Sequence, residues 1–169
     1  MGNSPTITTC STRTCRGGRG AGDPLFDISP GVVAAHPVGC ELREEARRRF
    51  LRCDPAHFST GDVVHADFAP ENTLADNGRL VGVVDWERCR VGDAGLDLVG
   101  MLFDIELGEK ALPAVRRRLW SALVERVPPD VRALYVTIYA VRYASWAINS
   151  PMERAVMALA TRQLLETKP

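Results

Sequence analysis

Lysine is almost absent from this sequence of 169 residues, which contains only Lys110 and Lys168 and takes its other positive charges from arginine. Lys+Arg and Asp+Glu both number 21, so the formal net charge is zero. A chain without an excess of either charge gives no support for a nucleic-acid or acidic-membrane partner. The composition therefore removes the two partners that a strongly basic chain would suggest.

Long apolar runs are missing as well. No run approaches the roughly 18 residues that a membrane helix needs, and the N-terminus lacks the apolar core of a secretory signal. With 46% hydrophobic and 25% charged residues, the composition is that of an ordinary soluble globular protein. We expect a cytoplasmic protein with one domain, since the length suffices for one proper core.

The five cysteines include no C-x-x-C pair, and without a secretion signal we expect reduced thiols. One spacing resembles a zinc site, because His36, Cys40, Cys53 and His57 read H-x3-C-x12-C-x3-H. The pattern between Cys40 and Cys53 predicts a helix, which would hold the two cysteines far apart. We therefore favour coincidence and keep structural zinc as the alternative.

Residues 1–39 show no sustained helical or strand period, although they contain a glycine-rich run at 16–22. A phosphate-binding loop would need a strand before it and a strand or helix after it, and neither is visible. We predict an irregular or disordered N-terminal segment over 1–39. A single folded unit is predicted over 40–169.

Apolar periodicity predicts a mostly helical unit. A first helix over 41–52 presents Leu42, Ala46 and Phe50 as one stripe. Later helices are predicted over 93–107, 112–126, 130–148 and 150–166, capped by Asp93, Asp130 and Ser150 where those residues begin them. The helix over 112–126 should turn Val115, Leu119 and Leu123 inward, and the helix over 130–148 is apolar on more than one side and should be central.

A short strand at Val63–Val64 and a hairpin interrupt the helices. The sequence Asp76-Asn77-Gly78 separates apolar runs at 73–75 and 80–84. Asn-Gly between such runs is the strongest short hairpin signal, because the tight turn needs residues that tolerate positive φ. The second strand should return Asp85 beside Asn72.

Three polar residues around this hairpin indicate phosphate chemistry. Asn72 and Asp85 offer oxygen ligands of the kind that suits Mg²⁺, which takes one or two protein oxygens and leaves positions for phosphate and water. Phosphoryl transfer also needs a carboxylate that orients the attacking hydroxyl. Asp67, five residues before Asn72, is placed for that role.

The same residues carry a resemblance to a known family. His65-x-Asp67 with Asn72 five residues later matches the H-x-D-x-x-x-x-N catalytic loop of the kinase superfamily. Val84-Asp85-Trp86-Glu87, followed by Gly92-Asp93 and Asp97-Leu98, resembles the aminoglycoside phosphotransferase family of small-molecule kinases. The likeness runs from about Glu41 to the C-terminus and is firmest over 63–99.

This resemblance implies an ATP- and Mg²⁺-dependent phosphotransferase that transfers the γ-phosphate to a hydroxyl of a small molecule. It implies Asp67 as the catalytic base and Asn72 and Asp85 as Mg²⁺ ligands that also hold the nucleotide. Leu74 matches a residue under the adenine ring. His65, Asp93 and Asp97 match positions that support the loop.

The implied fold is α+β, mostly α: a protein-kinase-like large (C-terminal) lobe with a short β-hairpin at the active site and the small lobe missing. The 64 residues before His65 contain no lysine and no convincing G-x-G-x-x-G, whereas a kinase small lobe supplies both. We therefore expect a truncated chain whose own activity is uncertain. One edge should expose apolar surface where a small lobe would dock, which makes self-association an expectation.

Each site residue also has a plainer interpretation. Asp67 and Asn72 could be turn formers, Asp85 could cap the sheet, and Asp93 is expected to cap a helix. Glu87 could face substrate or solvent. The sequence is compatible with three hypotheses for the whole chain: the phosphotransferase, a catalytically silent kinase-like lobe that works as a binding or interaction module, and a metal-dependent hydrolase using Asp67 and Asp85.

The acceptor cannot be read from the sequence. Acidic residues at Asp104, Glu106 and Glu109 could attract a cationic acceptor. The solvated end of a helix explains them equally well.

Overall fold

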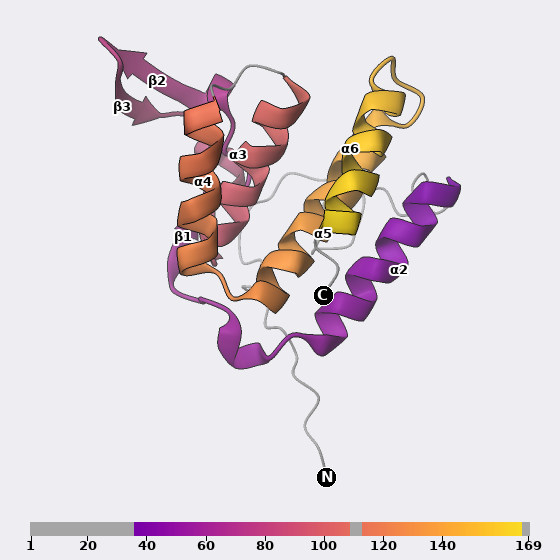
Figure 1. Cartoon of the computed structure of the whole chain (residues 1–169). Helices are drawn as coiled ribbons and strands as arrows, with labels where there is room; N and C mark the ends of the chain where they lie inside the picture. The colour runs from indigo at the N-terminus through magenta and orange to yellow at the C-terminus, as the bar shows by residue number, and fades with distance from the viewer. Residues whose placement is uncertain (1–35, 109–112, 167–169) are drawn as a thin grey trace.

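The computed structural model describes residues 36–108 and 113–166, which are mostly helical with two small antiparallel sheets (Figure 1). The α-helices in these ranges are α2 (Pro37–Arg52), α3 (Gly95–Leu107), α4 (Pro113–Arg126), α5 (Pro129–Ala147) and α6 (Glu153–Glu166). The strands are β1 (Asp62–Val64), β2 (Thr73–Asp76), β3 (Arg79–Val83) and β4 (Arg90–Gly92). Single turns of 3₁₀-helix lie at η1 (Pro55–His57), η2 (Pro70–Asn72) and η3 (Trp86–Arg88).

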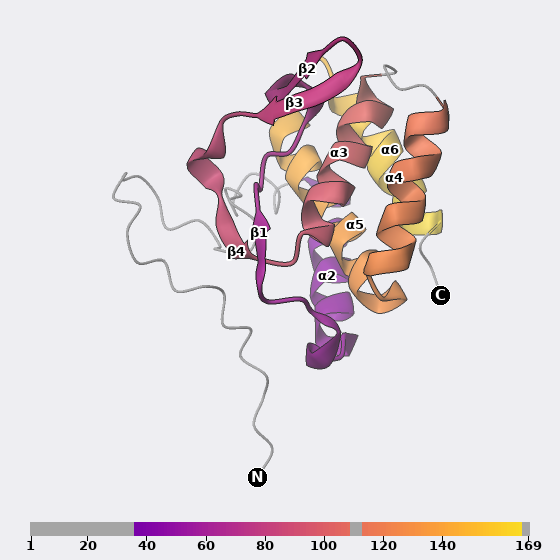
Figure 2. The same ribbon diagram turned by 90° about the vertical axis from the view of Figure 1, so that its left-hand side faces the viewer.

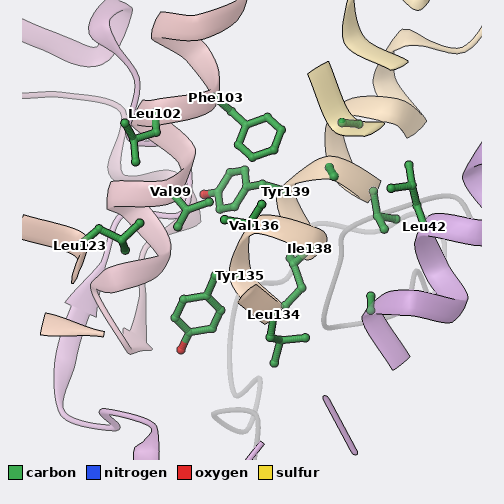
Figure 3. Close-up of a cluster of buried hydrophobic side chains, with 14 of the residues drawn as sticks. Leu42, Val99, Leu102, Phe103, Leu123, Leu134, Tyr135, Val136, Ile138 and Tyr139 are labelled. Carbon is green, nitrogen blue, oxygen red and sulfur yellow. The ribbon is translucent and has the colours of Figure 1, made fainter. Parts of the chain in front are cut away.

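Helix α5 lies in the middle of the fold, as its apolar sequence predicts. Its side chains are buried on several faces, and it packs against α2, α3 and α6. Figure 3 shows Tyr139 and Val136 of α5 directed toward Val99 and Phe103 of α3. A helix buried on more than one side needs apolar residues all round, and α5 has them.

Helix α2 covers another side of α5. Leu42 and Ala46 are fully buried, and Arg49 fastens the helix by donating from Nη1 to the carbonyl oxygen of Ala133 at 2.9 Å. The helix begins at Pro37, four residues before the predicted start. Proline at the first helical position is favourable because its fixed φ suits the helix and its missing N–H would have no partner there.

The two sheets lie along one side of the helices (Figure 2). Strand β2 pairs with β3 in the predicted hairpin, and its turn residues Asn77 and Gly78 have φ of 49° and 74°. Both φ values are those of the tight turn that Asn-Gly favours. Strand β1 pairs with β4, with Val63 opposite Val91. The sequence did not predict β4, because three residues carry no readable alternation.

Helix α4 corrects one packing prediction. Of the three residues expected to face inward, Leu123 is fully buried and Leu119 packs partly against the core. Val115 is 44% exposed, so its predicted inward position is wrong. The stripe therefore meets the core only in the C-terminal half of the helix.

The zinc spacing does not form one cluster. His36 precedes α2 and contacts Glu153, whereas His57 follows α2 and contacts Asp130. The 16 residues of α2 span about 24 Å, which separates the two pairs of possible ligands. The prediction for 1–39 falls almost wholly outside the described residues. Within the described ranges, no helix has the length and apolarity that crossing a membrane would require.

Candidate active site

The loop from His65 to Asn72 begins where β1 ends, and hydrogen bonds to a side chain of α3 hold its start. Val64, His65 and Ala66 are all buried. One carboxylate, that of Asp97 on α3, accepts both successive backbone N–H groups: His65 N–H to Oδ2 at 2.6 Å and Ala66 N–H to Oδ1 at 2.8 Å. Burial raises the pKa of Asp97, and these two hydrogen bonds oppose that rise. Asp97 therefore holds the start of the loop.

Ala66 has a φ of 66°, in the left-handed region that residues with a Cβ seldom occupy. Such a conformation costs on the order of 1 kcal/mol and persists only where neighbours hold it. Here the neighbours are Asp97, which binds the Ala66 N–H, and Arg142 of α5, which donates from Nη1 to the Ala66 carbonyl oxygen at 2.7 Å. The bend turns the next residue, Asp67, toward the helices.

His65 ties the loop to the end of the hairpin. Its Nε2 lies 2.8 Å from the carbonyl oxygen of Val84, so this nitrogen carries the proton that it donates. The indole of Trp86 packs against the imidazole at 4.6 Å between ring centroids. Trp86 in turn donates from Nε1 to the carbonyl oxygen of Val83 at 2.8 Å. The loop and the chain after β3 are thus braced on each other.

Asn72 and Asp85 both lie at the open end of the hairpin, Asn72 just before β2 and Asp85 two residues after β3. Thr73 is opposite Val83 in the ladder, and the Val84 N–H donates to the Asn72 carbonyl oxygen at 2.9 Å. Asp85 is the next residue, with φ 64° and ψ 54° in the left-handed region. The Asn72 side chain donates from Nδ2 to the Asp67 carbonyl oxygen at 2.9 Å, which leaves its amide oxygen as the group that can bind a cation.

Asp67 stands between the loop and α5. Its Oδ1 accepts a hydrogen bond from Arg142 Nη2 at 2.9 Å. It also borders a cavity of about 500 Å³. The other walls come from the loop, η3, α3 and α5, and combine aromatic with polar and charged residues: Phe68, Arg88, Gly100, Asp104, Tyr139, Arg142, Tyr143, Ser145 and Trp146. A cavity of this size, with aromatic faces and several charged groups, suits a small polar organic molecule.

Asp104 is the acidic group on the α3 wall of this cavity, and it accepts a hydrogen bond from the Tyr143 hydroxyl. Burial raises the pKa of Asp104; the hydrogen bond from Tyr143 opposes that rise, and the carboxylates of Glu71 and Asp67 add to it. The other acidic residues suggested for an acceptor do not join it. Glu106 pairs with Arg116 and Arg162, and Glu109 lies outside the described residues.

Two of the predicted residues lie away from the loop. Leu74 on β2 is 48% exposed and faces Gly82 across the hairpin. Asp93 accepts from the Gly95 N–H at 2.8 Å and the Ser59 N–H at 3.2 Å, so it fastens the start of α3 to the segment before β1. The structure therefore brings His65, Asp67, Asn72, Asp85 and Asp97 together and leaves Leu74 and Asp93 outside that group.

Sequence reasoning missed Arg142, Tyr143 and Trp146. They lie on α5, 75 or more residues beyond Asp67, and the helix was assigned to the core. Arg142 did leave a signal, because an arginine inside an otherwise apolar central helix is expected to have a specific partner. Nothing in the sequence indicated that the partner would be Asp67.

Comparison with known proteins identifies a family for this sequence. A family model described as the phosphotransferase enzyme family matches residues 15–134, more than two thirds of the chain. Hygromycin-B 4-O-kinase from Escherichia coli is 42% identical over 41 residues, which are 24% of this chain and 12% of that protein. The uncharacterized protein YcbJ from Bacillus subtilis (strain 168) is 28% identical over 109 residues, which are 60% of this chain and 30% of that protein.

The chain thus spans less than a third of the length of either of these relatives. No solved structure matches it significantly.

Proposed function

The chain belongs to the phosphotransferase enzyme family, and from this premise we propose that it is the large lobe of an ATP- and Mg²⁺-dependent kinase for a small hydroxylated molecule. The observation that carries the proposal is the position of Asp67, which borders the cavity and is linked through Asn72 to the end of the hairpin. A carboxylate between an acceptor cavity and a cation-binding edge is what phosphoryl transfer requires.

In this proposal each residue has one task. Asp67 orients the acceptor hydroxyl and takes its proton. Asp97 and His65 hold the loop that carries Asp67. The acceptor lies in the cavity, where Trp146 and Tyr143 provide apolar faces. The name of one relative, a 4-O-kinase, supports an oxygen atom as the acceptor group.

The donor set at the hairpin fits Mg²⁺. The Asn72 side chain uses Nδ2 in its hydrogen bond to Asp67, so its amide oxygen can bind a cation. Asp85 directly follows Val84, whose N–H donates to the Asn72 carbonyl oxygen. Two hard oxygen donors are the number that Mg²⁺ takes from proteins when phosphate and water complete its shell. When bound, the ion would neutralise charge on the phosphates. Leu74, exposed on β2, would lie under the adenine ring.

The first experiment measures phosphoryl transfer from radiolabelled ATP with Mg²⁺ by the full chain against a panel of small hydroxylated acceptors. Transfer by the native chain would support activity without a small lobe, and Asp67→Ala should then lower that transfer by about 10²–10⁴-fold, the usual contribution of a positioned acid or base. Asp76→Ala, at the exposed end of β2, is the matched control. Comparable turnover in Asp67→Ala would remove Asp67 from the mechanism.

A second candidate function is a catalytically silent lobe that acts as a binding or self-association module. Apolar side chains exposed on the two sheets favour it: Val63 is 64%, Leu80 63%, Val81 63% and Val91 52% exposed. Exposed apolar patches mark interaction surfaces. Concentration-dependent dimerisation in sedimentation velocity that Leu80→Ser abolishes, in a chain that transfers no phosphate, would favour this candidate over the kinase.

A further inference from the structure

We propose that Arg142 is a positioning residue for Asp67: it fixes one carboxylate oxygen so that the other is presented to the acceptor. This inference rests on the proposed function. Arg142 makes two contacts with consecutive loop residues, to the Ala66 carbonyl oxygen at 2.7 Å and to Asp67 Oδ1 at 2.9 Å. Because the guanidinium is planar and its donors are fixed in a fork, satisfying both acceptors sets the orientation of the loop relative to α5.

The direction of Arg142 is set by the core. Its guanidinium lies over the ring of Tyr139, 5.5 Å from the centroid, and Tyr139 is only 3% exposed. The phenol packs against the backbone of α3 at Gly100, where a Cβ would lie 2.6 Å from the Tyr139 hydroxyl oxygen. Absence of a side chain at Gly100 therefore lets Tyr139 occupy this place. The contacts run without a break from α3 through Tyr139 and Arg142 to Asp67.

Asp67 needs such support. Its side chain is 41% exposed, and the residue before it is in the left-handed region. A half-exposed carboxylate samples several rotamers unless something selects one. In the transfer step, the acceptor oxygen bonds to the γ-phosphorus while the bond from phosphorus to the leaving ADP oxygen breaks. The acceptor proton passes to Asp67 Oδ2, so the rate of transfer depends on the orientation of Oδ2.

Arg132 provides a matched control on the same helix. It donates from Nη1 to the carbonyl oxygen of Val127 at 3.1 Å and lies 5.8 Å from the ring centroid of Trp120. It therefore shares a carbonyl acceptor and an aromatic contact with Arg142, but it has no contact with the loop. A purely structural arginine on α5 should behave like Arg132.

The experiment compares the full native chain with Arg142→Ala, Arg142→Lys and Arg132→Ala. For Arg142→Ala we expect kcat to fall by about 10–100-fold while KM for the acceptor changes less than about threefold, since the residue acts through Asp67. Arg142→Lys should recover part of kcat, because an ammonium can satisfy one of the two acceptors. Arg132→Ala should keep the native kcat. Equal losses in Arg142→Ala and Arg132→Ala, or a loss confined to KM, would overturn the proposal.

A second measurement does not depend on activity. Three-bond NMR couplings report the χ1 rotamer of Asp67, and we expect one rotamer in the native chain and in Arg132→Ala but averaged values in Arg142→Ala. A native chain that transfers no phosphate would count against the proposed function, and the couplings would then decide the role of Arg142 alone. An unchanged Asp67 rotamer in Arg142→Ala would overturn that role.

Discussion

Around α5 the chain is held by apolar side chains that recur along each helix, whereas along β1, the loop over 65–72 and the hairpin it is held by single polar contacts. Leu42, Ala46 and Val141 are almost fully buried and belong to one hydrophobic cluster. In the loop, the bend at Ala66 is held by two side chains. The Asp97 carboxylate accepts from two N–H groups, and the Arg142 guanidinium donates to two acceptors. Removing a core side chain should therefore lower the free energy of unfolding, and removing a polar contact of the loop or hairpin should change the local conformation there.

The largest effect on stability is expected in the core, from Leu42→Ala. Leu42 is 0% exposed, and removing a buried leucine side chain costs about 2–4 kcal/mol through lost burial and the cavity left behind. Urea unfolding measures the change in the free energy of unfolding. Leu51→Ala in the same helix, at a residue 67% exposed, should cost less than about 0.5 kcal/mol. Similar costs for the two variants would show that α2 does not pack as described.

Gly100→Ala tests the junction between the two regions. The added Cβ would lie 2.6–2.9 Å from the Tyr139 ring and hydroxyl, and overpacking of this kind costs about 1–3 kcal/mol. Because Tyr139 borders the cavity and supports Arg142, the variant should also lower phosphoryl transfer. Gly61→Ala, where a Cβ meets nothing within 4 Å, is the control. If Gly100→Ala were as stable and active as the native chain, packing at Gly100 would not influence the Asp67 loop.

Asp85→Asn tests the edge alone. The variant removes one negative charge from an exposed side chain, so we expect unchanged stability but Mg²⁺-dependent nucleotide affinity at least about tenfold weaker, since even changes outside the metal ligands cause that loss. Titration with ATP in the presence and absence of Mg²⁺ measures it. Asp76→Asn at the far end of the hairpin should match the native chain. Unchanged affinity in Asp85→Asn would count against its role as a ligand.

The smallest effect is expected at the ion pair between His57 and Asp130, where Nδ1 lies 3.0 Å from both carboxylate oxygens. The hydrogen bond to Asp130 raises the pKa of His57 above its ordinary value. A histidine whose pKa is raised by folding adds stability that is complete below its unfolded pKa and is lost as pH rises through the folded pKa. The difference in Tm between the native chain and His57→Gln should therefore be larger at pH 5.5 than at pH 8.5. A difference independent of pH would mean that the pair is not ionic.

The same contrast explains what could be predicted from the sequence. The central position of α5 follows from its apolar residues on several faces, and the hairpin follows from Asn77-Gly78, because both are local patterns. The loop with Asp67 and Asn72 was found by spacing within eight residues. In contrast, Arg142 reaches Asp67 across 75 residues, and β4 is paired with β1 rather than with a neighbour in sequence. Residues that meet only after the chain has folded produce no local sequence pattern from which their contact could be predicted.

The helical wall of the cavity also determines where the chain tolerates changes in length. Helix α5 carries Asp130 near its start, bound to His57, and Arg142 twelve residues later, bound to Asp67. Deleting one residue between them would rotate every later side chain of the helix by about 100°. Arg142 and Tyr143 would then leave the cavity together. Insertions after Ala147 would leave this rotation unchanged, so homologues are expected to vary in length beyond α5 rather than within it.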